Sequence, residues 1–407
     1  MIKKIIIILL VVIVGLAGGL YWDGHSGHEI EHSDKPRILL THLHPSCIGG
    51  HYTFLSNLVS SGLKDKYDFA LASDKEISVF DVLEVAHIPR FEFQFRYNTN
   101  DWGHIINEAI HFRKICKEFQ PDIIHANGEI DSLIAVWSTL GLRKSPKIIR
   151  TFHETKVIEK NLQNWLVYKN RMSAAMFVSK YPFEYSNEKG GLHLDNVFII
   201  ENAIDLDKFK PQAPDIELKK KLKIPGNYFV FGSNAGLAPY KRVDLILQAA
   251  QMLKDQFEFK IVLLGQPDAI EMLKELAKNL GVSECLCYMG SCRDVRPYLS
   301  FFDIGFVLSD SIETISYASR EMLAMGIPLI SSNFSGLREN IINDYNGELI
   351  EPSNVKELVN AMKFFMTMPP SELQKYKEHA REHAIKCFDS HIQFAKIDQM
   401  YQSVLSK

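Results

Sequence analysis

The chain has few cysteines and no dense block of one charge. Its six cysteines are scattered through 407 residues, and none forms the two-residue-spaced pairs typical of a zinc site. Such sparse use fits a reducing compartment. The formal net charge is -3, and no Lys/Arg cluster is dense enough to indicate nucleic acid as a partner. We therefore expect neither a structural zinc site of paired cysteines nor a nucleic-acid function.

Long apolar runs are equally scarce, because only the segment Ile5 to Trp22 is long and uncharged. As a helix its eighteen residues would span about 27 Å, enough for the core of a bilayer. The segment predicts a single membrane anchor. A cleaved signal peptide is the alternative, with Ala17, Gly18 and Gly19 as small residues near the cut. In the polar segment that follows, the histidines at 25, 28 and 32 indicate either a metal site or a juxtamembrane linker.

The rest of the chain has the size and composition of two globular domains. Hydrophobic residues make up 46% and charged residues 23% of the sequence. Short apolar segments alternate with amphipathic ones, first from Arg37 to Ser179 and again from Tyr228 onward. This alternation predicts two parallel sheets, each covered by helices on both faces. The predicted helices of the second half include Val243 to Leu253 and Pro370 to Cys387.

In the first half, polar and glycine residues follow the predicted strands. Gly49 and Gly50 come after the first strand, His125 and Asn127 stand at the end of a later strand, and His153 follows the next. Ligands of parallel sheets collect at the carboxyl ends of the strands. These residues are therefore candidates for a binding site, although His153 could also be a hydrogen-bonded core residue.

The most informative stretch of the second half runs from residue 306 to residue 352. It predicts a strand, a loop with Glu313, a helix capped by Ser316 that contains Glu321, and a helix end at Gly326. A helix N-terminus attracts phosphate, and carboxylates accept hydrogen bonds from sugar hydroxyls. This combination suits a nucleotide sugar.

The order and spacing of this block, with Glu321-Met-Leu-Ala-Met-Gly326-Ile-Pro328 at its centre, resemble the donor-binding region of retaining glycosyltransferases of group 1 and family 4. The resemblance implies the GT-B architecture, in which two Rossmann-like doubly wound parallel-sheet domains of the α/β class face each other across a cleft. The expected parts are an anchor and linker (1–35), an acceptor domain (36–205), a donor domain (206–388) and a C-terminal helix that returns to the first domain (389–407).

The resemblance also implies roles for individual residues. It places Glu313, Lys241 and His153 in catalysis, with Glu313 on the donor sugar and Lys241 on its phosphates. It adds a donor-binding set and an acceptor-side set: Glu321, Lys241, Arg242, Thr314, Ile315 and Ser316, then Gly49, Gly50, His125 and Asn127.

Two departures from the family pattern stand out. The usual phosphate-binding arginine is absent, since Ala235 and Gly236 stand at its spacing, so Arg242 or another basic group would have to substitute for it. The usual Gly-Phe-Gly after the first glutamate is replaced by Thr314-Ile315-Ser316, which resembles a subfamily form.

Together with the membrane anchor predicted from Ile5 to Trp22, the resemblance implies a membrane-anchored hexosyltransferase-like enzyme that uses no metal and no cofactor. Its co-substrate would be a nucleoside-diphosphate sugar, and its acceptor a glycan or lipid-linked hydroxyl in envelope polysaccharide, lipopolysaccharide or glycolipid synthesis. Asp205 and Asp207 look like a metal-binding acidic pair, but their turn context argues against that role. The missing arginine motivates one alternative, a catalytically degenerate binding module at the membrane. A nucleotide-sugar epimerase is another.

The side of the membrane is an open expectation. Lys3 and Lys4 predict that the N-terminus lies inside and the later residues outside. A nucleotide-sugar enzyme would need the cytoplasmic side, where we expect the catalytic domains.

Overall fold

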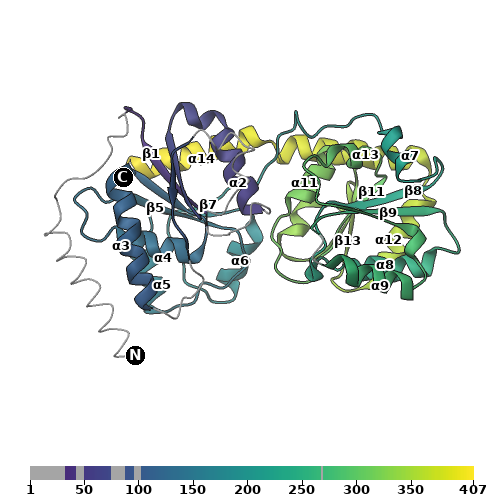
Figure 1. Cartoon of the computed structure of the whole chain (residues 1–407), viewed down its shortest axis with the longest axis horizontal. Coiled ribbons are helices and arrows are strands. Elements are labelled where there is room, and N and C mark those ends of the chain that lie inside the picture. Colours follow the sequence, from purple (N-terminus) through teal and green to yellow (C-terminus); the bar gives the residue numbers. More distant parts are fainter. Residues whose placement is uncertain (1–32, 43–49, 75–87, 96–101, 267–268) are drawn as a thin grey trace. The chain divides into compact units, whose positions relative to one another are not determined.

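The computed structural model describes residues 33–42, 50–74, 88–95, 102–266 and 269–407. This part of the chain divides into two compact units (Figure 1). The first contains the described residues up to Val178, together with Phe183–Ile200 and Phe394–Lys407. The second contains Ser179–Pro182 and Glu201–Gln393.

The first unit is built on a parallel sheet of seven strands in the order β3-β2-β1-β4-β5-β6-β7. Its strands are β1 (Arg37–His42), β2 (Asp68–Ser73), β3 (Arg90–Glu92), β4 (Ile123–Ala126), β5 (Lys147–Phe152), β6 (Ala174–Phe177) and β7 (Val197–Ile199). Its main helices are α2 (Gly50–Ser60), α3 (Trp102–Phe119), α4 (Glu129–Ser138) and α6 (Lys180–Glu188), the last of which begins in residues of the second unit.

The second unit has a parallel sheet of six strands in the order β10-β9-β8-β11-β12-β13. The strands are β8 (Phe229–Ser233), β9 (Phe259–Leu264), β10 (Leu286–Gly290), β11 (Ile304–Val307), β12 (Leu329–Ser332) and β13 (Gly347–Ile350). The longer helices are α8 (Val243–Leu253), α9 (Ile270–Asn279), α11 (Tyr317–Ala324), α12 (Val355–Thr367) and α13 (Pro370–Cys387).

Burial explains why both sheets are parallel and central. Strand residues such as Ile38, Leu39 and Leu40 are fully buried in succession, as expected where helices cover both faces. In the second unit, α8 and α12 pack on one face of the sheet and α11 and α13 on the other (Figure 1). The predicted pair of Rossmann-like parallel sheets is thus confirmed.

Helix α11 begins and ends where its sequence directs. Ser316 caps it and accepts a hydrogen bond from the Ser319 amide at 3.4 Å. At the other end Gly326 adopts a left-handed conformation with φ of 77°, and the amide of Ile327 donates to the carbonyl of Met322. The predicted cap and the predicted terminator are both confirmed.

Arg320 fixes α11 against the rest of the second unit. Its side chain is fully buried, yet it pairs with Glu201, donates to Asn340 Oδ1 at 3.0 Å and lies 4.1 Å above the Phe388 ring. A buried cation is tolerated only with such a set of partners. Arg320 therefore holds α11 in a fixed position within the second unit.

The last helix, α14 (Ser390–Leu405), belongs to the first unit from Phe394 onward. The predicted membrane anchor, Ile5 to Trp22, lies outside the described residues. Among the residues that are described, no helix combines the length and the apolar character needed to cross a bilayer.

Candidate donor site

The second sheet places its candidate site residues by topology. From β8 the chain moves outward to β9 and β10, and it then returns to pair β11 with the other side of β8. The loops that follow β8 and β11 therefore diverge from a topological switch point, where open α/β sheets bind ligands. Lys241 lies in the loop after β8, Glu313 in the loop after β11, and Glu321 in the helix that this second loop enters.

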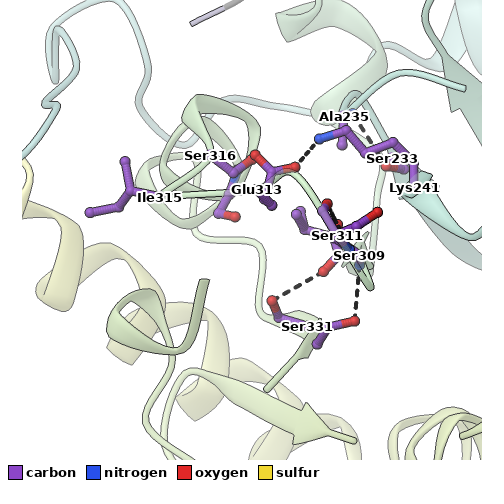
Figure 2. Close-up of polar contacts among 12 residues, drawn as sticks. Ser233, Ala235, Lys241, Ser309, Ser311, Glu313, Ile315, Ser316 and Ser331 are labelled. Carbon is purple, nitrogen blue, oxygen red and sulfur yellow. Dashed lines mark hydrogen bonds and ion pairs between the residues drawn. The ribbon is translucent and has the colours of Figure 1, made fainter. Parts of the chain in front are cut away.

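Lys241 and Glu313 form an ion pair between these two loops (Figure 2). Each side chain is only 11% exposed, so the attraction is screened less than that of a surface pair. The Lys241 ammonium also lies 5.2 Å from the centre of the Tyr240 ring. The structure thus brings the two residues predicted for donor phosphate and donor sugar into direct contact.

Arg242 has partners other than those predicted. Its guanidinium binds Asp244 at 2.9 Å and Asp310 at 2.7 Å, and it also donates to Ser353. The hydrogen bonds and charges of the two aspartates raise its pKa further above the usual value. Its positive charge is therefore already balanced, and Arg242 connects the β8 loop to the β11 loop instead of replacing the missing arginine.

The loop that carries Glu313 is conformationally strained. Ile312 and Ser316, on either side of it, have φ of 51° and 53°, which residues other than glycine rarely adopt. Ile315 is 1% exposed, so its side chain belongs to the core, and its place in the donor-binding set stays a prediction. Thr314 and Ser316 are partly buried, and Ser316 is engaged as the cap of α11.

Glu321 is the second carboxylate of the site and lies in α11. One of its oxygens accepts a hydrogen bond of 2.6 Å from the side-chain amide of Asn234. Burial raises the pKa of Glu321 to about 7, while the Asn234 amide and the Lys208 charge oppose that rise. Near neutral pH this carboxyl is therefore present in both its charged and its neutral form.

Serine hydroxyls join the strand ends beneath the site. Ser233 donates to the carbonyl of Phe306 at 2.8 Å, Ser331 donates to that of Val307 at 3.1 Å, and the Ser309 amide donates to the Ser332 hydroxyl at 3.0 Å. Figure 2 shows Ser233, Ser309 and Ser331 close to the Lys241 and Glu313 pair. The sequence analysis missed these serines and Asn234, although all of them stand at strand ends, where ligands collect.

In the first unit, two of the predicted acceptor-side residues are buried. His125 is 0% exposed, and its ring nitrogens hydrogen-bond to the hydroxyls of Tyr401 at 2.7 Å and Thr151 at 2.6 Å. Asn127 is 1% exposed and donates to the Thr41 carbonyl at 3.1 Å. These side chains stabilise the strand ends and do not face solvent, and their contact with the acceptor stays a prediction.

The other first-unit candidates differ in their placement. His153 is partly buried, contacts Asn127 Oδ1 at 3.2 Å and packs against the His51 ring at a centroid distance of 4.0 Å. Gly50 is exposed at the start of α2, and Gly49 lies outside the described residues. His153 and Gly50 thus keep the accessibility that a binding residue needs.

Metal-binding side chains do not gather anywhere in the described ranges: no group of three or more His, Cys, Asp or Glu residues could hold an ion. Asp205 Oδ1 instead accepts the amides of Asp207 and Lys208, both at 2.9 Å. The carboxylate closes a turn, as its sequence context predicts.

Two family sequence models match the chain. The model for glycosyl transferases group 1 matches residues 214–383, and that for glycosyltransferase family 4 matches residues 48–208. The chain is a group 1 glycosyltransferase. The predicted match to glycosyltransferases of group 1 and family 4 and the predicted enzymatic class are therefore confirmed.

Two curated relatives of this glycosyltransferase have names that include a lipid-linked sugar or a glycolipid. It is 26% identical to the UDP-Gal:alpha-D-GlcNAc-diphosphoundecaprenol alpha-1,3-galactosyltransferase of Escherichia coli, over 63% of this chain and 69% of that protein. It is 25% identical to the alpha-monoglucosyldiacylglycerol synthase of Streptococcus pneumoniae, over 67% of this chain and 64% of that protein. The chain thus spans about two thirds of the length of each.

Solved structures share the fold of this glycosyltransferase over nearly its whole length. A glycosyltransferase from Rickettsia africae superposes with a TM-score of 0.79 at 21% identity and covers 92% of this chain and 99% of its own. Anabaena Alr3699/HepE, solved in complex with UDP-glucose, gives a TM-score of 0.76 at 19% identity, over 90% of this chain and 99% of its own. These likenesses show the GT-B fold.

The buried His125 predicts a specific acid sensitivity. Burial lowers its pKa to about 3, whereas an unfolded histidine titrates near 6.5. Between these values the unfolded chain binds an extra proton, so stability falls as pH falls from about 6.5 toward 3. His125→Asn should be less stable than wild type at pH 7.5, but the difference should shrink by about 3 kcal/mol at pH 4.5. Urea unfolding at both pH values measures it.

The control for this experiment is His111→Asn, because His111 is exposed on α3. That variant should follow the pH dependence of the wild type. If the difference between His125→Asn and wild type is the same at both pH values, the buried neutral imidazole is not the cause of the acid sensitivity.

Proposed function

We propose that this glycosyltransferase is a retaining enzyme that moves a sugar from a nucleoside-diphosphate sugar to a hydroxyl of a glycan or lipid-linked acceptor. Envelope polysaccharide, lipopolysaccharide or glycolipid synthesis is the proposed setting. The observation that carries the proposal is the contact between Lys241 and Glu313 beside the N-terminus of α11. One cation, one acid and the free amides of a helix start are what an anionic leaving group and a sugar require.

In the proposed reaction, the bond between the sugar's anomeric carbon and the diphosphate oxygen breaks, and the diphosphate keeps the electron pair. The acceptor hydroxyl attacks from the same face and gives its proton to the leaving phosphate. Charge grows on the diphosphate as the bond breaks, so Lys241 and the α11 amides act chiefly on the transition state. Glu313 holds hydroxyls of the donor sugar and Glu321 those of the ribose. No metal is proposed.

On the acceptor side, His153 is the proposed catalytic residue of the first unit, because it is partly buried and lies at the end of β5. Gly50, at the exposed start of α2, is the proposed point of close backbone approach.

Nucleotide release from a panel of UDP-, GDP- and ADP-sugars tests the reaction. The full chain should release nucleotide from one of them, and Lys241→Ala and Glu313→Ala should each lower kcat/KM by about 100-fold or more. Lys220→Ala and Glu217→Ala are matched controls, because these residues form an exposed ion pair of 2.9 Å on α7 (Ile216–Lys221), and they should leave the rate unchanged. Tight binding without release would indicate the binding module, and an altered sugar still joined to its nucleotide would indicate an epimerase.

The ion pair between Lys241 and Glu313 predicts that a neutral residue at 313 strengthens the binding of free nucleotide, although it weakens sugar transfer. A diphosphate can reach Lys241 only if Glu313 gives up its contact, and the Glu313 charge repels the incoming phosphates. Glu313→Gln should therefore bind UDP about tenfold more tightly while it loses transfer activity. Calorimetric titration with UDP measures this, with Glu217→Gln as the control. Equal or weaker UDP binding by Glu313→Gln would show that the pair does not compete with the phosphates.

We also propose that residues 5–22 anchor the chain, with the two units on the cytoplasmic face, where nucleotide sugars are available. Added protease should then leave the units intact in spheroplasts and cut them in inverted vesicles. Digestion in intact spheroplasts would overturn this placement.

A further inference from the structure

The side chain of Asn234 has an unusual position at the end of β8. Its Nδ2 group donates to Glu321 Oε2 at 2.6 Å, while its Oδ1 atom is buried and has no hydrogen-bond partner within the described part of the chain. A buried amide oxygen without a partner costs free energy. The orientation of the amide is therefore set by the carboxylate, since the reverse orientation would place two acceptors against each other.

The contact leaves Glu321 with one occupied and one available oxygen. Oε2 receives the Asn234 hydrogen bond, and Oε1 makes no hydrogen bond with any described residue. The bond is short and charge-assisted, which is the strong class of hydrogen bond. It restricts the carboxyl group to one orientation at the same edge of the sheet as Lys241.

The surroundings of Glu321 make its charge depend on Asn234. Burial favours the neutral form, and the groups that favour the ionised form are the Asn234 amide and the Lys208 ammonium. The hydroxyl of Tyr317, in the first turn of α11, is buried as well, and the charge of Glu321 contributes to raising its pKa. Tyr317 therefore does not supply a charge that could replace the amide.

We propose that Asn234 is a positioning residue for donor binding, which holds Glu321 ionised and oriented so that Oε1 accepts hydroxyl groups of the bound nucleotide. This inference rests on the proposed function, because it assigns a ligand to the same site. It adds a residue that the sequence analysis did not select and that acts through Glu321 without touching the donor.

The test is calorimetric binding of UDP to the full chain between pH 6 and pH 8.5. Without the amide, the pKa of Glu321 should rise. If this pKa rises by one unit from about 7, the ionised fraction of Glu321 falls about fivefold at pH 7 but only slightly at pH 8.5. Asn234→Ala should therefore bind UDP about fivefold more weakly than wild type at pH 7 and nearly as well at pH 8.5. The ratio to wild type at each pH cancels the titration of UDP itself.

Two further variants sharpen the result. Asn234→Asp keeps the shape but places a second carboxyl group against Glu321, so its loss at pH 7 should exceed that of Asn234→Ala. Asn227→Ala is the matched control, because Asn227 donates to Glu258 at 2.7 Å in a similar pair that precedes β8, and it should bind UDP as wild type does.

Each outcome decides the question. A loss that is equal at all pH values overturns the claim that Asn234 keeps Glu321 ionised, and UDP binding by both Asn234 variants that equals wild type overturns the positioning role as a whole; the proposed function stands in either case. Failure of the wild type to bind any of UDP, GDP and ADP at any pH overturns both the proposed function and this inference.

Discussion

The parallel pairing of β8 with β11 is the constraint on which the candidate site depends. Gly232 and Gly305 pair in adjacent strands, and a Cβ atom at Gly232 would lie 2.0 Å from the Phe302 ring. A Cβ atom at Gly305 would lie 2.5 Å from the side chains of Leu329 and Met322. Because both positions are glycine, the covering residues can pack directly on the sheet. The loops after both strands then emerge side by side at its carboxyl edge.

Electrostatic balance is the second property of this edge. Lys241 is paired with Glu313, and Arg242 is paired with Asp244 and Asp310. Partly buried charges without such partners would be costly, so this pairing stabilises the loops when no ligand is present. An anionic ligand therefore gains affinity by exchange of partners and not from an exposed cation. Lys241 can take part in this exchange because Glu313 is its single ion-pair partner among the described residues, whereas Arg242 is held by two aspartates.

The sequence predicts the parts of the site that local rules determine. The bounds of α8 and α13, the Ser316 cap and the Gly326 terminator follow from periodicity and capping, and each is found as predicted. These rules do not predict which side chains form hydrogen bonds with each other or which of them are buried. His125 stands at a strand end just as His153 does, yet only tertiary packing around Thr151 and Tyr401 buries it. Asn234 was missed for the same reason, since its role depends on a residue 87 positions away in the sequence.

The phosphate-binding arginine is absent from a loop whose backbone conformation favours glycine. Gly236 has a φ of 92°, which disfavours any larger residue, although a Cβ atom there would meet no neighbouring atom. A Cβ atom at Gly265 would lie 2.5 Å from the Gly236 Cα, so the loops after β8 and β9 approach each other backbone to backbone. An arginine at 236 would have to adopt this disfavoured φ or change the backbone conformation of the loop. With no arginine at this spacing, Lys241 and the backbone amides of α11 are the groups that we propose for the diphosphate.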